Sequence, residues 1–287
     1  MTVADQAAAA GLHRVGARPP LLRYLVETWD RRDFIVTLAR SRQRAANEAN
    51  RLGMLWMGLR PLINAGIYSL IFGGLLGVRH PGWPASYYVA FIVIGIFFFE
   101  FFSSCMIQGA KSITNGRSLV QSLSFPRITL PLASVAEQFL VFLASSSVLF
   151  VILLITGNWP RWEWLLFPPL VALFTIFNTA VALIFARFTT VIVDVQQFLP
   201  YVSRILFYTS GVIWQLSWLQ ERLPAWLNAV FQFHPLVQAL EIARGVLLKG
   251  YTYPLHYWAA FAAWAIGLLV IAVWLFWSAE ETYGRVN

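Results

Sequence analysis

Long apolar runs fill most of the chain, and short polar segments separate them. Several runs approach or exceed the roughly 17 to 25 apolar residues that a helix needs to cross a bilayer. A helix satisfies its backbone polar groups internally, whereas a membrane barrel would show short alternating segments. We therefore predict an all-α integral membrane fold with six spans, at about 60–78, 87–110, 130–156, 165–185, 198–219 and 257–277.

The segment before the first span divides into a tail and an amphipathic stretch. Residues 1–20 are rich in alanine and lack the apolar core of a secretory signal, so we predict a disordered cytoplasmic tail. In residues 21–56, apolar side chains recur at helical spacing and several arginines follow them. This pattern predicts an amphipathic helix at the inner membrane surface and a basic linker; a merely solvated linker is the alternative. The arginines of interest are Arg23, Arg31, Arg32 and Arg40.

A short polar segment at 113–130, here called the elbow, separates the two longest apolar runs. Its Asn115-Gly116 pair is typical of a turn, and Pro126 disfavours helical geometry at Phe125. Residues 118–124 can therefore form one or two helical turns where the chain leaves the membrane. A plain connecting loop is the alternative.

The segment 220–250 differs from the other connections of the predicted membrane domain, which covers 57–287. Pro224 and Pro235 each suit the first turn of a helix. Four apolar residues then share one helical face: Leu236, Leu240, Ala243 and Leu247. We predict two short re-entrant helices that form a gate, because such segments are tolerated when they are buried in protein or line a wet cavity. An interfacial loop anchored by tryptophans is the alternative.

The second predicted span carries a polar stripe. Glu100 interrupts a run of phenylalanines, and Ser103, Ser104 and Gln108 share its helical face. An unpaired charge at mid-bilayer costs at least about 2.5 kcal/mol. We therefore expect this face of the helix to face a protein interior or a translocation pathway rather than lipid. Glu137 in the third span is a second such residue. For both carboxyl groups, a protonated or helix-pairing side chain is the alternative.

Composition and charge agree with a membrane protein. The chain is 59% hydrophobic and 12% charged, which excludes a soluble globular domain. Its net charge of +8 does not indicate nucleic-acid binding, because the basic residues gather in the N-terminal segment and the loops of one membrane side. This asymmetry predicts that both ends lie inside the cell. The tryptophans and tyrosines cluster at span ends as interfacial belts do, although some could stack on sugar rings.

The motifs of common catalytic sites are missing from the sequence. Neither lysine, Lys111 or Lys249, stands in a G-x-x-x-x-G-K-[ST] loop, so the chain has no nucleotide site of that kind. The histidines form no pair at metal-ligand spacing, and the single cysteine, Cys105, excludes a disulfide framework. We therefore expect no catalytic residue, no metal and no cofactor in this chain.

From residue 21 onward, the order of these features resembles the membrane subunits of ABC-2-type exporters of polysaccharides such as O-antigens and teichoic acids. The resemblance rests on L-G-M-L-W-M-G-L-R-P-L at the first span, F-P-R in the elbow and H-P-L-V-Q-A-L-E-I-A-R before the last span. One departure is V-I-V-D-V-Q-Q-F-L-P, where relatives usually carry an Arg-Asp pair and only Asp194 remains here.

The resemblance implies a half-transporter that dimerises and works with two copies of a separate ATPase subunit, which would bind ATP and Mg²⁺. The residues that would contact this subunit are Asn115, Arg117, Phe125, Pro126 and Arg127. The translocation path would involve Glu100, Ser103, Ser104 and Gln108, and the gate would involve His234, Pro235, Glu241 and Arg244.

We therefore expect a subunit in the bacterial cytoplasmic membrane that exports a polyprenyl-pyrophosphate-linked polysaccharide. The four N-terminal arginines would attract the pyrophosphate at the lipid surface, at about 1 kcal/mol per basic residue. The Ala- and Arg-rich composition most resembles actinobacterial members that export the galactan of the cell wall. The alternatives are an ABC-2 permease for a small drug or lipid, and a membrane enzyme that acts on polyprenyl carriers.

Overall fold

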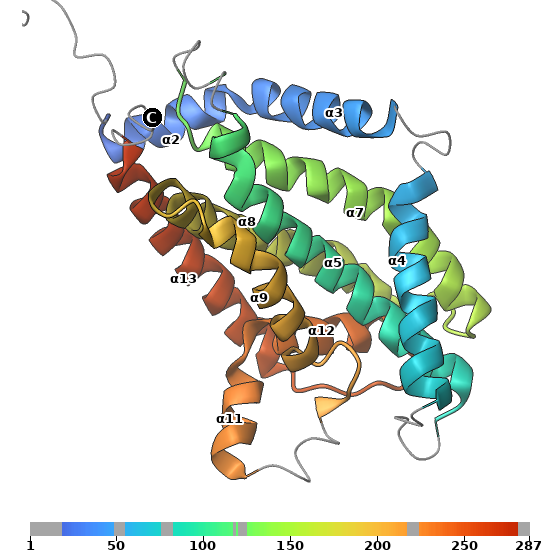
Figure 1. The fold of residues 1–287 in the computed structure, drawn as a ribbon. Helices are drawn as coiled ribbons and strands as arrows, with labels where there is room; N and C mark the ends of the chain where they lie inside the picture. Colours follow the sequence, from blue (N-terminus) through green and yellow to red (C-terminus); the bar gives the residue numbers. More distant parts are fainter. Residues whose placement is uncertain are drawn as a thin grey trace, which may run out of the picture.

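The computed structural model describes residues 19–48, 55–75, 83–116, 119, 125–216 and 224–280 (Figure 1). Every regular element in these ranges is a helix. In chain order they are α2 (Leu21–Asp30), α3 (Arg32–Glu48), α4 (Leu55–Tyr68), η1 (Ser69–Leu75), α5 (Ala85–Asn115), α7 (Thr129–Ile155), η2 (Trp162–Leu166), α8 (Phe167–Val191), α9 (Val195–Thr209), α11 (Ala225–Phe233), α12 (Pro235–Leu247) and α13 (His256–Ser278). The all-α prediction is confirmed for the described part of the chain.

Four of the described helices are long and apolar enough to cross a membrane. They are α5, α7, the continuous helix formed by η2 and α8, and α13. A multi-pass membrane protein is therefore confirmed. The predicted count of six spans stays a prediction, because neither α4 with η1 nor α9 is among these four. Both nevertheless pack against α5, at the places expected for the first and fifth spans.

The helix at the place of the predicted fifth span is shorter than predicted. Helix α9 begins at Val195 and ends at Thr209, whereas a helix as far as 219 was expected. The chain turns at Gly211, whose φ of +78° is a conformation that other residues rarely adopt. The indole of Trp214 then folds back and donates a hydrogen bond of 2.7 Å to the carbonyl of Tyr208. This bond satisfies one of the carbonyl groups left open at the end of α9.

Two other helices have different bounds from those predicted. Helix α4 begins at Leu55, so Pro61 lies inside it rather than in its first turn. Gly58 allows this earlier start, because the helix approaches Val148 of α7 so closely that a Cβ there would lie 2.6 Å from a methyl group. Helix α8 continues past 185 to Val191, since the hydroxyl of Thr189 donates to carbonyl groups within the bundle.

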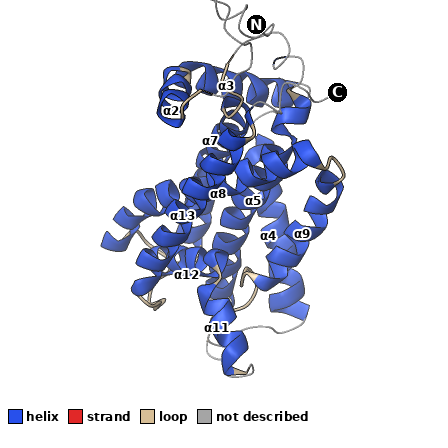
Figure 2. Cartoon of the chain, turned by 90° about the vertical axis from the view of Figure 1, so that its left-hand side faces the viewer, coloured by secondary structure: helices blue, strands red, loops and turns tan. Residues whose placement is uncertain are grey.

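The N-terminal stretch forms two helices in succession. The amphipathic helix predicted from residue 21 is present as α2, and after a break at Arg31 the chain continues helically in α3 to Glu48. Helix α3 lies across α7 (Figures 1 and 2). Residues 1–18 of the predicted tail lie outside the described residues.

Helix α5 lies at the centre of the bundle, where it packs against α4, α7, α8, α9 and α12 (Figure 1). The ring of Phe101 stacks on Phe142 of α7 at 4.7 Å between centroids and lies 5.9 Å from Phe174 of α8. At Gly109, α5 approaches α8 so closely that a Cβ would lie 2.5 Å from that of Ala182. Contacts on several sides therefore fix the direction in which the polar face of α5 points.

The two ends of the bundle carry different elements (Figure 2). Helices α2 and α3 lie at one end, together with the C-terminal end of α13; we call this the α2 end. Helices α11 and α12 lie at the opposite end, the α11 end. The indole of Trp277 near the end of α13 donates to the carbonyl of Pro19 at 2.8 Å. The described N-terminal and C-terminal segments thus meet at one end of the bundle.

A second hydrophobic cluster, separate from the main core, fills the α2 end. We call it the α2-end cluster. Its buried members are Tyr24, Ile113, Ile128, Leu130, Ala180, Leu183, Ala186, Ala272, Phe276 and Ala279. They come from α2, α5, the elbow, α7, α8 and the end of α13. This end of the bundle therefore packs as a unit of its own.

Candidate functional site

The polar stripe of α5 borders two cavities, and α4 contributes to the lining of both. The first, the α3 cavity, has a volume of about 270 Å³ and is lined by α3, α4, α5 and α7. The second, the α9 cavity, has a volume of about 340 Å³ and is lined by α4, α5 and α9. Glu100 and Ser104 line both cavities, Ser103 lines the second and Gln108 lines the first. All four predicted path residues therefore face open space rather than a sealed core.

The α3 cavity combines polar groups with aromatic rings. Its polar lining residues are Gln43, Arg60, Glu100, Ser104, Gln108, Glu137, Gln138 and Ser145. Trp56, Phe97, Phe101 and Phe142 supply the rings. One carboxyl oxygen of Glu100, Oε2, is buried and has no hydrogen-bond partner among the described residues. This oxygen is available to accept a hydrogen bond from a ligand hydroxyl or from water.

Helix α9 forms one wall of the second cavity. The hydroxyl groups of Ser103 on α5 and Ser203 on α9 lie 2.6 Å apart and share a hydrogen bond. The next residue, Arg204, and Phe207 one turn further along α9 line the same cavity. The serine pair therefore fixes α9 against the polar face of α5.

Arg42 connects α3 to α7 beside the α3 cavity. Its Nη1 donates a hydrogen bond of 3.2 Å to the hydroxyl of Ser134. Burial lowers the pKa of Arg42, and the nearby Glu137 carboxyl opposes that change. A half-buried side chain of α3 thus ties this helix to α7 next to the α3 cavity.

The predicted gate residues Glu241 and Arg244 do not line either cavity. Arg244 on α12 is fully buried, and its Nη2 donates to the carbonyl of Val212 at 2.8 Å. Its Nη1 lies 3.5 Å from Glu241, and the Tyr251 hydroxyl donates to that carboxylate at 2.9 Å. A buried charge is tolerated only when it is paired in this way. These contacts make both residues anchors that join α12 to the turn after α9.

His234 and Pro235 form the joint between the two short helices predicted before the last span. His234 ends α11 and precedes α12, and Pro235 is the first residue of α12, as expected. All residues of α12 from Leu236 to Leu247 are buried, whereas α11 buries none. The two predicted helices are therefore present, and their role as a gate stays a prediction.

The connection between α7 and α8 holds the C-terminal end of α12. Arg161 donates to the carbonyl of Leu248 at 2.7 Å, and the indole of Trp164 donates to that of Leu247 at 3.3 Å. The amide of Lys249 donates to the side chain of Asn158 at 3.0 Å. These bonds satisfy carbonyl groups that a helix end leaves open. Sequence reasoning missed them, because no local pattern relates this connection to α12.

The elbow is described at its two ends and at Leu119. Asn115 is the exposed last residue of α5, and Phe125, Pro126 and Arg127 lead into α7. The ring of Phe125 lies 5.4 Å from that of Phe34 on α3. Arg117 lies outside the described residues, as does most of the short helix predicted at 118–124. Contact with an ATPase subunit stays a prediction.

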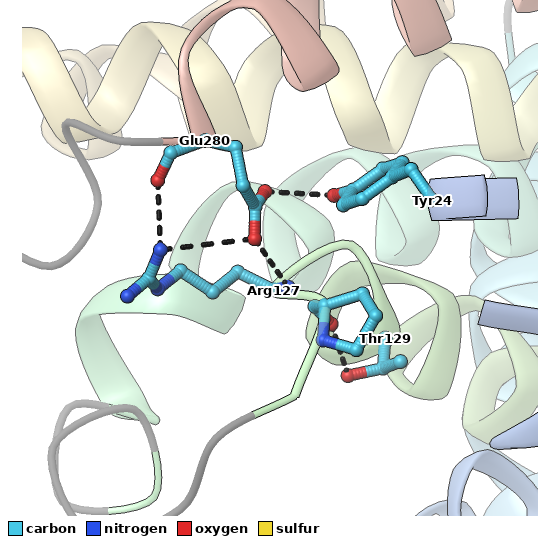
Figure 3. Close-up of polar contacts among 5 residues, drawn as sticks. Tyr24, Arg127, Thr129 and Glu280 are labelled. Carbon is cyan, nitrogen blue, oxygen red and sulfur yellow. Dashed lines mark hydrogen bonds and ion pairs between the residues drawn. The ribbon is translucent and has the colours of Figure 1, made fainter. Parts of the chain in front are cut away.

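Arg127 is bound to Glu280 at the end of α13 (Figure 3). The Arg127 amide donates to Oε1 of Glu280 at 2.9 Å, and its Nη1 donates to the backbone carbonyl of Glu280 at 2.8 Å. The hydroxyl of Tyr24 on α2 donates to the other carboxyl oxygen at 2.7 Å. Burial raises the pKa of Glu280, and the bonds from Arg127 and Tyr24 oppose that rise. Sequence reasoning missed Tyr24 and Glu280.

The predicted pyrophosphate-binding arginines are exposed on the α2 end. Arg23 pairs with Glu27 at 2.8 Å, and Arg32 lies over the ring of Trp29 at 5.7 Å. Arg31 and Arg40 are exposed as well. On α2, Tyr24 and Thr28 face the protein, while large apolar side chains are exposed: Leu22, Leu25, Val26 and Trp29. An exposed apolar face beside arginines is typical of a helix that lies in a membrane surface.

Comparison with known proteins gives consistent matches. The family model described as ABC-2 type transporter matches residues 33–248. The O-antigen export system permease protein RfbA of Myxococcus xanthus is 24% identical over 265 residues, covering 92% of this chain and 99% of the relative. RfbA of Klebsiella pneumoniae is 25% identical over 219 residues, which cover 76% of this chain and 81% of the relative. The polysialic acid transport protein KpsM of Escherichia coli is 27% identical over 205 residues, which cover 70% of this chain and 76% of the relative.

These matches confirm the family that the sequence motifs indicated, and they favour a transport component over an enzyme. The matched region includes α3, both cavities, the described ends of the elbow and the two short helices α11 and α12. Because the family model covers well over half of the chain, the protein belongs to the ABC-2 type transporter family of membrane proteins.

Proposed function

We propose that this chain is the membrane subunit of an ATP-driven exporter of a polyprenyl-pyrophosphate-linked polysaccharide. The observation that carries the proposal is the polar face of α5, which borders two cavities inside an otherwise apolar bundle. The similar proteins named for O-antigen export and polysialic acid transport support a polysaccharide as the cargo.

The lining of the α3 cavity suits sugar rings. Sugars offer hydroxyl groups that donate and accept hydrogen bonds, and their ring faces are apolar. Carboxyl and amide groups such as Glu100, Gln108 and Gln138 match the hydroxyl groups, and the rings of Trp56 and Phe101 match the ring faces. An apolar drug would leave the buried Oε2 of Glu100 without a partner, which costs about 1 to 3 kcal/mol.

The α2 end supplies a surface for a lipid carrier. The exposed apolar residues of α2 support a position of this helix in the membrane surface. Arg23, Arg31, Arg32 and Arg40 would then be available to a pyrophosphate group of the lipid carrier. The α2 end then faces the cytoplasm, with both chain ends inside the cell. The positive-inside distribution of arginines supports this orientation.

Energy comes from an ATPase subunit that binds the α2 end. The chain's sequence carries no P-loop of its own, and the elbow lies at the α2 end together with α2 and α3. We propose that the ATPase subunit presses on Asn115, Arg117 and the segment from Phe125 to Arg127. Two membrane subunits would join with two ATPase subunits, and the glycan would pass between the membrane subunits.

At the opposite end, α11 and α12 form the outer gate of the proposed exporter. Helix α12 is fixed by its buried contacts, whereas α11 buries no residue and joins α12 through His234. The gate would therefore open by movement of α11, with Glu241 and Arg244 holding its base. The galactan of an actinobacterial cell wall is the cargo that the composition of the chain favours.

Depletion of this chain from its own cells tests the proposal. A lipid-linked polysaccharide should accumulate inside the cells, and the chain should co-purify with an ATPase subunit. Normal surface glycan with lost drug resistance would instead support a permease for small molecules. Turnover of a polyprenyl-linked substrate by the purified chain without an ATPase would support a membrane enzyme.

A further inference from the structure

Three segments that are distant in the sequence meet at Glu280 (Figure 3). They are the segment just after α13 at Glu280, the segment just before α7 at Arg127 and the amphipathic helix α2 at Tyr24. The carboxyl group of Glu280 is shared between the other two segments, since Oε1 accepts from the Arg127 amide and Oε2 accepts from the Tyr24 hydroxyl. The partners lie 153 and 256 residues away in the chain.

Arg127 is held through its main chain and its side chain at once. Its amide donates to the Glu280 side chain, and its guanidinium donates to the Glu280 backbone carbonyl at 2.8 Å. The neighbouring turn is closed by Thr129, whose hydroxyl donates to the carbonyl of Pro126 at 2.9 Å. Two fixed points on one residue prevent the segment 125–128 from rotating relative to α13.

The junction is largely buried, and the side chain of Arg127 is its more exposed member at 18%. Glu280 is 5% exposed and Tyr24 is fully buried. Tyr24 belongs to the α2-end cluster, together with Ile128 of the elbow and Phe276 of α13. Hydrogen bonds to an ionisable group in such a site are stronger than those exposed to water, and loss of one partner leaves the others unsatisfied.

We propose that Glu280 is a positioning residue that makes the elbow, α2 and the end of α13 move as one unit. This inference rests on the proposed function, in which an ATPase subunit presses on the elbow. A push on 125–128 would then displace the membrane-surface helix α2 and the transmembrane helix α13 together. Without Glu280, the elbow would yield to the ATPase subunit and the displacement would stop there.

The test uses the full chain in complex with its ATPase subunit, with ATP and orthovanadate as the probe. Hydrogen exchange is measured with and without the probe at three places: the elbow from 125, α2, and the last turns of α13. In the wild-type complex, all three should respond. In Glu280→Gln, the elbow should still respond, while the responses of α2 and α13 should fall by about fivefold or more, a typical size for coupling between sites.

Glu27→Gln is the matched control, because it removes an exposed carboxylate from α2 that pairs only with Arg23. It should behave as wild type. If the Glu280→Gln chain does not form a complex with the ATPase subunit, the Tyr24→Phe variant is used to test the inference instead. This variant retains the buried ring and removes only the hydroxyl group. It should reduce the response of α2 by about twofold or more, as expected for loss of one hydrogen bond.

The outcomes separate this inference from the proposed function. A Glu280→Gln complex in which α2 and α13 respond as in wild type overturns the positioning role and leaves the proposed function standing. A wild-type elbow that binds no ATPase subunit, or that does not respond to nucleotide, overturns both. A loss of response in parallel at all three places indicates a merely structural role for Glu280 and also overturns the inference.

Discussion

The guanidinium of Arg244 lies against the ring of Phe91, with 3.4 Å between its central carbon and the ring centroid. The same group donates to the carbonyl of Val212 and pairs with Glu241. One side chain of α12 therefore contacts the central helix α5 and the turn after α9. Cation–π contacts of this kind are stronger when they are removed from water.

Replacement of Arg244 by methionine should destabilise the protein strongly. Met fills a similar volume but leaves the buried Glu241 carboxylate without its ion partner, which costs about 3 to 5 kcal/mol. The measurement is thermal unfolding in detergent. The double variant Arg244→Met with Glu241→Gln should recover part of the loss, and Lys249→Met, at an exposed position, should change little. A single variant as stable as wild type would show that the pair does not anchor α12.

A large side chain at Ser104 should block export. This residue lines both cavities, so Ser104→Trp would fill the space between α4 and the polar face of α5. We expect the export rate to fall by about tenfold or more, which corresponds to about 1.4 kcal/mol in the barrier. Surface glycan and internal lipid-linked glycan are measured together. Ser147→Trp, on an exposed face of α7, is the control. Equal export by both variants would exclude the cavities from the path.

Substitution of Gly109 should separate α5 from α8. In Gly109→Ala the new Cβ would lie 2.5 Å from the Cβ and 2.8 Å from the Cα of Ala182, so the backbones must move apart. Such overpacking costs about 1 to 3 kcal/mol, to be measured as a decrease in thermal stability. Gly267→Ala on α13 has no atom within 4 Å of its new Cβ and should be neutral or slightly stabilising. The close approach of the two helices is not essential if both variants unfold alike.

Reversal of charge at Arg31 and Arg32 should reduce transport without loss of the ATPase subunit. Both side chains are exposed at the α2 end, and each basic residue near an anionic lipid surface contributes about 1 kcal/mol of attraction. Export and co-purification of the ATPase subunit are measured for Arg31→Glu with Arg32→Glu. Lys249→Glu, at the α11 end, is the control. Unchanged export would remove these arginines from lipid recognition.

The sequence pattern was sufficient for the long helices and insufficient where the chain turns within an apolar run. Helices α5, α7 and α13 stand close to their predicted places because an uninterrupted apolar run has few other stable forms in lipid. The end of α9 was misplaced, because Val212 and Ile213 continue the apolar pattern past the turn that Gly211 makes. A single glycine in an apolar run does not by itself indicate a turn.

Only those residues of the candidate site that lie together on a single helix could be predicted from the sequence. Helical periodicity placed Glu100, Ser103, Ser104 and Gln108 on one face of α5, and that face does border the cavities. The same reasoning could not show that Glu241 and Arg244 are buried anchors, since their partners lie on other elements. Nor could it find Glu280, whose contacts depend on how α2, the elbow and α13 pack together.

The alanines of the α2-end cluster have a mechanical consequence. In this cluster, α8 and α13 contribute the small side chains of Ala180, Ala186 and Ala272. Deeper in the bundle, the same two helices contact each other through the rings of Phe174 and Phe261. Small-amplitude shear between packed helices is cheapest where few side chains interdigitate. Within the α2-end cluster, a small shift of α13 along α8 should therefore cost less than in the phenylalanine layer deeper in the bundle.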